Sequence, residues 1–349
     1  MRPPTAASHL LLGVVLCSLP VFAGEGPEGS EEQKESGKMQ IKFVRPFQHL
    51  TSERMDYEYH YAKSNIARID ELLASDKRKV LDSCYSQLKG YCLCAALCEY
   101  LAGNDGEMFA WFRRSVQAGV SLFRTPPHTT KITSIDTTTG KVLSVKHRFE
   151  TSFYAPYKYE NLVQVALLLG DKDLLRQVGE IDHRIYFGSE SHYTYPEPYE
   201  EAKVLREVCL GRENFARARL KRWDGTQIMA ELSEFEWPAH PDDPPFEEWT
   251  GCKTTFIRGI EAVLNNDPKA LGEALTEHLK DYQGYRAKLG GWVSLPEKVI
   301  CLPAVSMAVF ARRHGMEVDV KNNYLPMPLV DILTRADTQQ APASPTQDP

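Results

Sequence analysis

The C-terminal part of the chain contains a helix-forming stretch that is apolar on nearly every side. It runs from Ser294 to Gly315 and includes an almost unbroken apolar run from Ala304 to Ala311. Ser294 with Glu297 has the spacing of a capping box, and Gly315 after basic residues is typical of a helix C-terminus. A helix without a polar face cannot lie on a surface, so we expect it at the centre of a helical core.

The rest of the body repeats one local pattern, which predicts a mainly α fold. An apolar helix ends in a short turn carrying Gly or Asn, and an amphipathic helix follows at once. The four turns are Leu101–Asp105, Leu169–Asp173, Leu210–Asn214 and Leu264–Pro268. One such pair cannot bury its apolar stripe alone, so we expect stacked antiparallel helix pairs in a single compact, repeat-like domain. The copies stand at irregular intervals, unlike the fixed period of a tetratricopeptide array.

The ends of the chain and one internal segment depart from this helical pattern. Residues 1–23 have the features of a signal peptide, and the Gly/Glu/Ser-rich residues 24–38 predict a flexible linker. The helical domain then spans residues 39–334, and the tail 335–349 is predicted to be disordered. Two runs of alternating residues around a glycine-containing turn predict an inserted β-hairpin at about 131–146.

The compartment stays open between two alternatives. The leader favours export, and its apolar run is too short for a membrane-spanning helix, so we expect no stable membrane insertion. Of the 8 cysteines only Cys17 lies in the leader, so an odd number remains. The crowding of Cys92, Cys94 and Cys98 on one helix suits a reduced protein instead. Translation from Met39 would remove the leader and give a cytoplasmic protein.

Motifs of catalysis and metal binding are missing from the sequence. There is no His-x-x-x-His or Cys-x-x-Cys pair, no Gly-x-Ser-x-Gly elbow and no phosphate-binding glycine loop. Cys94 and Cys98 share a helix face while Cys92 points elsewhere, so we interpret all three as core residues. His183 and His314 each follow a helix and are interpreted as surface or capping residues. We therefore expect no catalytic residue, no metal and no cofactor.

The segment between Trp223 and Cys252 is acidic, aromatic and rich in proline, and it contains no Lys or Arg. Aromatic anchors surrounded by charge of one sign capture oppositely charged partners. We take residues 231–249 as an acidic aromatic loop, whose candidate partner-binding residues are Glu231, Glu234, Phe235, Glu236, Trp237, Asp242, Asp243, Phe246, Glu247, Glu248 and Trp249. The alternative is a solvated loop whose aromatic side chains only fasten it to the helices.

The C-terminal third carries a recognisable order of residues. Its elements are Phe256–Glu261, Asn265–Asp267, a helix with Leu271, Leu275 and Leu279, a helix over Cys301–Ala311, Arg313–Val318 and Tyr324–Pro326. In this order the chain resembles the immunity protein 49 family of bacterial polymorphic toxin systems, clearly over about 250–333 and loosely over 55–225. The resemblance implies a mainly α-helical fold and a protein that binds and neutralises a cognate toxin.

Together these observations predict a non-enzymatic immunity protein whose partner is a cognate toxin. A basic toxin would complement the acidic loop, and the net charge of −6 argues against nucleic-acid binding. The alternative is a helical repeat-like scaffold or adaptor for other proteins. A third possibility is an enzyme with an unfamiliar helical fold, because a nucleophile and a base need only meet in space. The sequence leaves the oligomeric state open.

Overall fold

The described part of the chain is mainly α-helical, as the sequence predicts. The computed structural model describes residues 44–45, 51–74, 81–124, 129–135, 142–149, 156–181, 197–223, 253–289 and 295–339. The predicted leader 1–23 and linker 24–38 lie outside these residues. Within the part that is described, every helix falls short of the length and apolar character that crossing a membrane requires.

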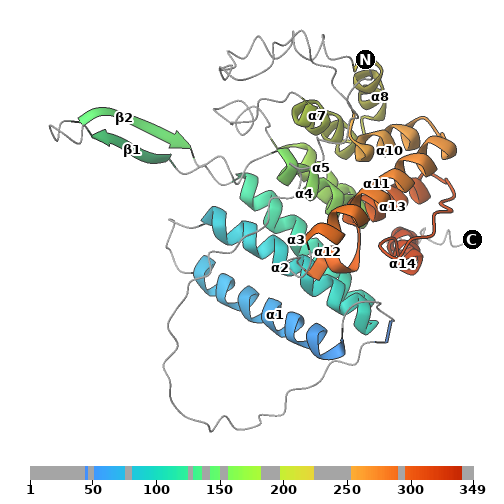
Figure 1. Ribbon diagram of the computed structural model, residues 1–349, viewed down its shortest axis with the longest axis horizontal. Coiled ribbons are helices and arrows are strands. Elements are labelled where there is room, and N and C mark those ends of the chain that lie inside the picture. Colours follow the sequence, from blue (N-terminus) through green and yellow to red (C-terminus); the bar gives the residue numbers. More distant parts are fainter. Residues whose placement is uncertain are drawn as a thin grey trace, which may run out of the picture. The chain divides into compact units, whose positions relative to one another are not determined.

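Each of the four predicted turns joins two helices that pack on each other (Figure 1). The pairs are α2 (Leu81–Ala102) with α3 (Asp105–Arg124), α4 (Pro156–Leu169) with α5 (Lys172–Gly179), α7 (Glu197–Cys209) with α8 (Glu213–Lys221), and α10 (Thr255–Leu264) with α11 (Pro268–Leu289). Every turn contains one residue with positive φ, a glycine in three turns and Asn266 in the fourth. A residue in this conformation turns the chain away from the helix axis and satisfies the last carbonyl groups of the helix.

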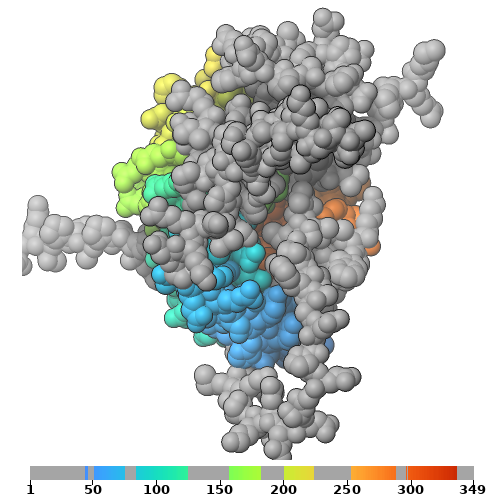
Figure 2. Space-filling view, turned by 90° about the vertical axis from the view of Figure 1, so that its left-hand side faces the viewer, coloured from blue at the N-terminus to red at the C-terminus, as the bar shows by residue number. Residues whose placement is uncertain are grey.

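One further helix, α1 (Ser52–Ala74), precedes the first pair and packs on α2. Its buried face consists of Met55, Ala62, Ile66 and Ile69, which recur at helical spacing. From there the contacts continue from α2 to α3, from α3 to α4, and from α4 to α7. In Figure 2, part of the surface of α1 is visible in blue.

The apolar C-terminal helix is the centre of the core, as expected. It is α13 (Leu302–Arg313), and it packs on α4, α10, α11 and α14 (Met327–Gln339). All residues from Ala304 to Ala311 are buried, the polar Ser306 included. The Ser306 hydroxyl donates to the carbonyl oxygen of Leu302 at 2.8 Å and lies 3.0 Å from that of Gln164. A polar group in a fully buried position is thus satisfied without water.

The prediction of one continuous helix from Ser294 to Gly315 is wrong. A short helix, α12 (Leu295–Val299), begins just after Ser294, which itself lies outside the described residues, and α13 begins only at Leu302. Pro303 explains the break, because proline has no N–H and fits only the first turn of a helix. The N–H of Cys301 donates to the carbonyl oxygen of Tyr324 at 2.8 Å instead of to the preceding turn.

Two segments differ in extent from the prediction. Strand β1 (Thr129–Ile135) pairs antiparallel with β2 (Val142–Phe149), with an irregular register between Ser134 and Ile135. The residues between the strands, 136–141, lie outside the described part, so the inserted hairpin stays a prediction. Helix α14 continues to Gln339, beyond the predicted end of the domain at residue 334, because extending an existing helix costs less than starting one.

Candidate functional site

The residues predicted to bind a partner are not among those that the structure describes. Glu231, Glu234, Phe235, Glu236, Trp237, Asp242, Asp243, Phe246, Glu247, Glu248 and Trp249 all fall between residues 224 and 252. Their role stays a prediction. The structure does describe the residues that flank this segment, Trp223 before it and Lys253 and Thr254 after it.

Both ends of the segment are fastened to the core. Before it, Trp223 packs against the main hydrophobic cluster just after α8. After it, the N–H of Thr254 donates to the Glu201 carboxylate at 3.0 Å, and Lys253 pairs with Glu261 at 2.6 Å. The Thr254 hydroxyl caps α10 by accepting from a backbone N–H. Since α8 and α10 contact each other, the segment begins and ends on neighbouring helices.

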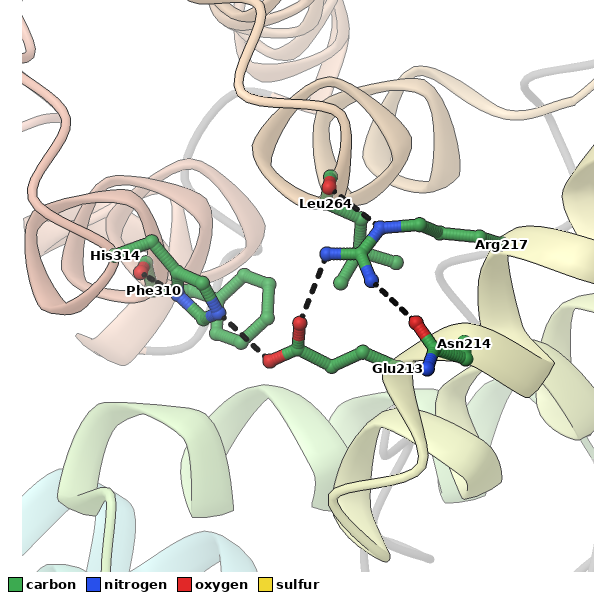
Figure 3. Close-up of polar contacts among 6 residues, drawn as sticks. All are labelled: Glu213, Asn214, Arg217, Leu264, Phe310 and His314. Atoms are coloured by element: carbon green, nitrogen blue, oxygen red, sulfur yellow. Dashed lines mark hydrogen bonds and ion pairs between the residues drawn. The ribbon is translucent and has the colours of Figure 1, made fainter.

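A polar network ties the start of α8 to the end of α10 (Figure 3). Glu213, the first residue of α8, accepts from Nη2 of Arg217 at 3.0 Å, the i,i+4 spacing that favours such a pair. The same guanidinium donates through Nε to the carbonyl oxygen of Leu264 at 2.7 Å and through Nη1 to Asn214 at 3.1 Å. Arg217 therefore caps the C-terminus of α10 while it holds the first turn of α8.

The other oxygen of Glu213 reaches the end of α13. His314 is the C-cap residue of α13, which agrees with its interpretation from the sequence as a surface or capping residue. Its Nε2 lies 3.0 Å from Glu213 Oε1, and its Nδ1 lies 2.9 Å from the carbonyl oxygen of Phe310 (Figure 3). The ring also stacks at a tilt on the Phe310 side chain. The Glu213 carboxylate thus links α8 to α13, and Arg217, which also bonds to it, extends this link to α10.

The electrostatics of this network favour a structural tie over a catalytic base. The hydrogen bond from His314, together with Arg217, lowers the pKa of the Glu213 carboxyl, so Glu213 is ionised at neutral pH. An ionised carboxylate and a carbonyl oxygen can only accept hydrogen bonds. Both ring nitrogens of His314 are thus engaged by protein oxygen atoms, which suits a residue that links helices. His183, the other histidine considered in the sequence, lies outside the described residues.

The cysteines of α2 occupy the positions that the sequence predicts. Cys94 and Cys98 belong to the main hydrophobic cluster, whereas Cys92 belongs to a smaller one. Burial raises the pKa of the Cys92 thiol to about 12, and a hydrogen bond with Cys94 together with burial raises that of Cys98. Protonated, buried thiols are poor ligands and nucleophiles. Among the described residues, His, Cys, Asp and Glu do not gather in groups that could hold a metal ion.

The comparison with protein families decides the class of this fold. Residues 104–329 match the family described as immunity protein 49, which is most of the chain. The chain belongs to the immunity protein 49 family. The likeness, clear in the sequence from about residue 250, extends back to the turn between α2 and α3, so α1 and α2 precede the matched part. Comparisons with curated proteins and with solved structures give no match.

Membership of the immunity protein 49 family indicates the general role of the protein. Immunity proteins neutralise toxins, so the family implies a toxin-neutralising role and a protein toxin as the partner. Such proteins are generally non-enzymatic. The matched residues include the acidic aromatic loop and both of the points that fasten it, Trp223 and Thr254. The sequence signals Glu213 and Arg217 by their spacing, but it does not reveal their link to His314.

Proposed function

We propose that this protein neutralises its cognate toxin by stoichiometric binding, without catalysis, and that the acidic aromatic loop at residues 231–249 provides contacts to the toxin. The match to the immunity protein 49 family over residues 104–329 carries the proposal. The loop lies inside the matched part and is fastened at Trp223 and Thr254 to helices that contact each other.

The chemistry of the loop determines which toxin it fits. The segment between Trp223 and Cys252 carries carboxylates and contains no Lys or Arg. Its negative charge attracts a basic surface and speeds association with it. The aromatic residues among them supply apolar contact area that charged groups cannot. A basic toxin, such as one whose active-site cleft binds an anionic substrate, presents the matching surface. Fastening of both loop ends reduces the conformational entropy that binding removes.

Co-expression with the toxin domain encoded beside this protein tests the function. We expect cells that produce the toxin domain to survive only when this protein is also produced. The purified pair should then form a complex of fixed stoichiometry in sedimentation or gel filtration. Equal killing by the toxin domain with and without this protein would contradict the proposed function.

Charge reversal tests the part played by the loop. Replacing Glu234, Glu236, Asp242 and Asp243 by Lys should slow association with the toxin at low salt, because it reverses the steering charge. The effect should shrink as added salt screens the charges. Four exposed acidic residues outside the loop provide a control of equal net charge when replaced by Lys: Glu107, Glu180, Glu273 and Glu317. Equal association rates for the two variants would exclude the loop as the contact surface.

A helical scaffold or adaptor is the alternative that the fold itself suggests. Helix pairs that pack in succession, from α2 and α3 through α4 to α7, are a common basis for protein assembly. Several partners of modest affinity, recovered together from cells with the tagged protein, would favour this alternative. One tight partner encoded beside it would favour the immunity function.

A further inference from the structure

Helix α1 carries a second stripe of side chains on the face opposite its buried one. While Met55, Ala62, Ile66 and Ile69 pack on α2, a row of exposed residues runs along the outer face. The row consists of Arg54, Tyr57, Tyr61, Ser64, Arg68 and Glu71. Their spacing alternates between three and four residues, as in the seam of two packed helices.

The aromatic part of this outer stripe is exposed and already ordered. Tyr57 is 56% and Tyr61 is 39% exposed, although both are large and partly apolar. Their rings stack with centroids 6.0 Å apart and planes 12° apart, and the Arg54 guanidinium lies 5.1 Å from the centre of the Tyr57 ring. Tyr61 in turn meets the edge of Tyr91 on α2. Side chains held in this way lose little entropy on binding, and Tyr and Arg are the residues that most often dominate interfaces.

The order of residues along the stripe is complementary to itself. When a second α1 is laid antiparallel about an axis midway between Tyr61 and Ser64, Arg54 lies opposite Glu71 of the second copy. In the same alignment Tyr57 lies opposite Arg68, which suits a cation–π contact. The large Tyr61 then lies opposite the small Ser64. In a parallel alignment, Arg54 would instead face Arg54 of the second copy and Arg68 would face Arg68, and like charges in contact are unfavourable.

We propose that two copies of this chain associate through the outer stripe of α1, with the two helices antiparallel. In the usual form of homodimer, the same surface is used by both copies, so a pair of residues that meets on one side of the twofold axis meets again on the other. The Arg54–Glu58 pair within one helix, at 2.5 Å, does not prevent this, because exposed ion pairs contribute little and exchange partners readily. Two arginines and one glutamate suit a basic toxin poorly, so a second copy is the better occupant.

This association goes beyond the proposed neutralisation of a toxin. Helix α1 ends before residue 104, where the match to the immunity protein 49 family begins. The dimer is therefore a property of the part of this chain that precedes the matched residues. Loss of self-association would leave the family assignment and the loop at residues 231–249 unaffected, and failure of neutralisation would leave the dimer unaffected.

Sedimentation velocity of the full-length chain over a range of concentrations tests the proposal. We expect a reversible monomer–dimer equilibrium. R54E and E71R should each weaken dimerisation about tenfold or more, because each places like charges opposite one another at two symmetric positions. An equimolar mixture of R54E and E71R should restore dimers, since every reversed charge then meets an opposite one. That restoration also shows that both variants are folded.

Charge reversals on α11 serve as controls. Lys269 and Glu273 form an exposed pair with the same two charges, and K269E and E273R should leave dimerisation unchanged. A chain that stays monomeric at all concentrations would overturn the proposal, as would a dimer that R54E and E71R leave intact. A mixture of R54E and E71R that stays monomeric would overturn the antiparallel register. Loss of toxin binding in R54E from a monomeric protein would assign the stripe to the toxin instead.

Discussion

Gly119 on α3 shows how a single missing side chain lets two helices approach each other. A Cβ atom at this position would lie 2.5 Å from Cδ1 of Leu162 on α4, well inside van der Waals contact. Leu162 is fully buried and has little room to move. The packing of α3 on α4, and so of the first helix pair on the second, depends on this glycine.

Replacement of Gly119 by Ala should therefore destabilise the protein. Overpacking of a filled core costs about 1–3 kcal/mol of unfolding free energy. Gly272 on α11 is the matched control, because a Cβ there would meet nothing within 4 Å. Alanine at that position should raise the unfolding free energy by about 0.5–1 kcal/mol, since glycine is unfavourable inside a helix. Denaturant unfolding measures both; equal stability of the two variants would contradict the proposed contact.

Glu160 near the start of α4 should give the protein a pH-dependent stability. Burial raises the pKa of its carboxyl to about 7, and Gln164 Nε2 donates to it at 2.8 Å. The folded protein therefore holds this proton at pH values where the unfolded chain has released it. By linkage, stability decreases as pH rises from about 4.5 to about 7 and then changes no further through this group.

Replacement of Glu160 by Gln should remove that dependence. Relative to the unchanged protein, the variant should gain about 2–3 kcal/mol in unfolding free energy between about pH 5 and about pH 8. Parallel unfolding curves at the two pH values measure this difference. A constant difference between variant and unchanged protein would show that Glu160 titrates normally.

At the scale of elements, the end of α13 joins three helices. The Arg313 guanidinium donates to the carbonyl oxygens of Leu167 and Leu168 at the end of α4, the latter at 3.0 Å. It also donates to the carbonyl oxygen of Leu333 in α14 at 2.9 Å. Carbonyl groups at helix ends lack intrahelical partners and carry partial negative charge, so a cation is well placed there.

Replacement of Arg313 by Met should cost about 2–4 kcal/mol of unfolding free energy, because it removes charge-assisted hydrogen bonds and leaves partly buried carbonyl groups without a donor. Arg176 is the control: among the described residues it pairs with Asp173 and Glu180 on the exposed side of α5, where replacement by Met should have little effect. Thermal unfolding compares the two variants. A similar midpoint for both would show that α4, α13 and α14 hold together without Arg313.

The helix pairs could be predicted from the sequence because their signals are local. Glycine or asparagine in the turn, followed by a residue that starts the next helix, marks each boundary within a few residues. The break between α12 and α13 escaped prediction because the apolar pattern runs on across it. Pro303 was the available signal, and the contact that fixes the break, from Cys301 to Tyr324, joins residues far apart in sequence.

At the scale of the whole molecule, the sequence predicts the central place of α13 and the immunity protein 49 family, and the structure and the family match confirm both. The network at Glu213 could not be predicted, since His314 lies 101 residues further along the chain. Pairings at such distance depend on how helices pack, which a single sequence does not specify. The loop at residues 231–249 remains a prediction from composition.

Trp223 follows α8 and Thr254 precedes α10, two helices in mutual contact, and this has an evolutionary consequence. When a connection joins two helices that already pack on each other, lengthening it adds only slowly to its closure entropy. Insertions, deletions and wholesale replacement between these two residues are therefore compatible with an unaltered helical framework. If the loop contacts the toxin as proposed, exchange of one contiguous stretch of the gene would direct such a protein to a different toxin.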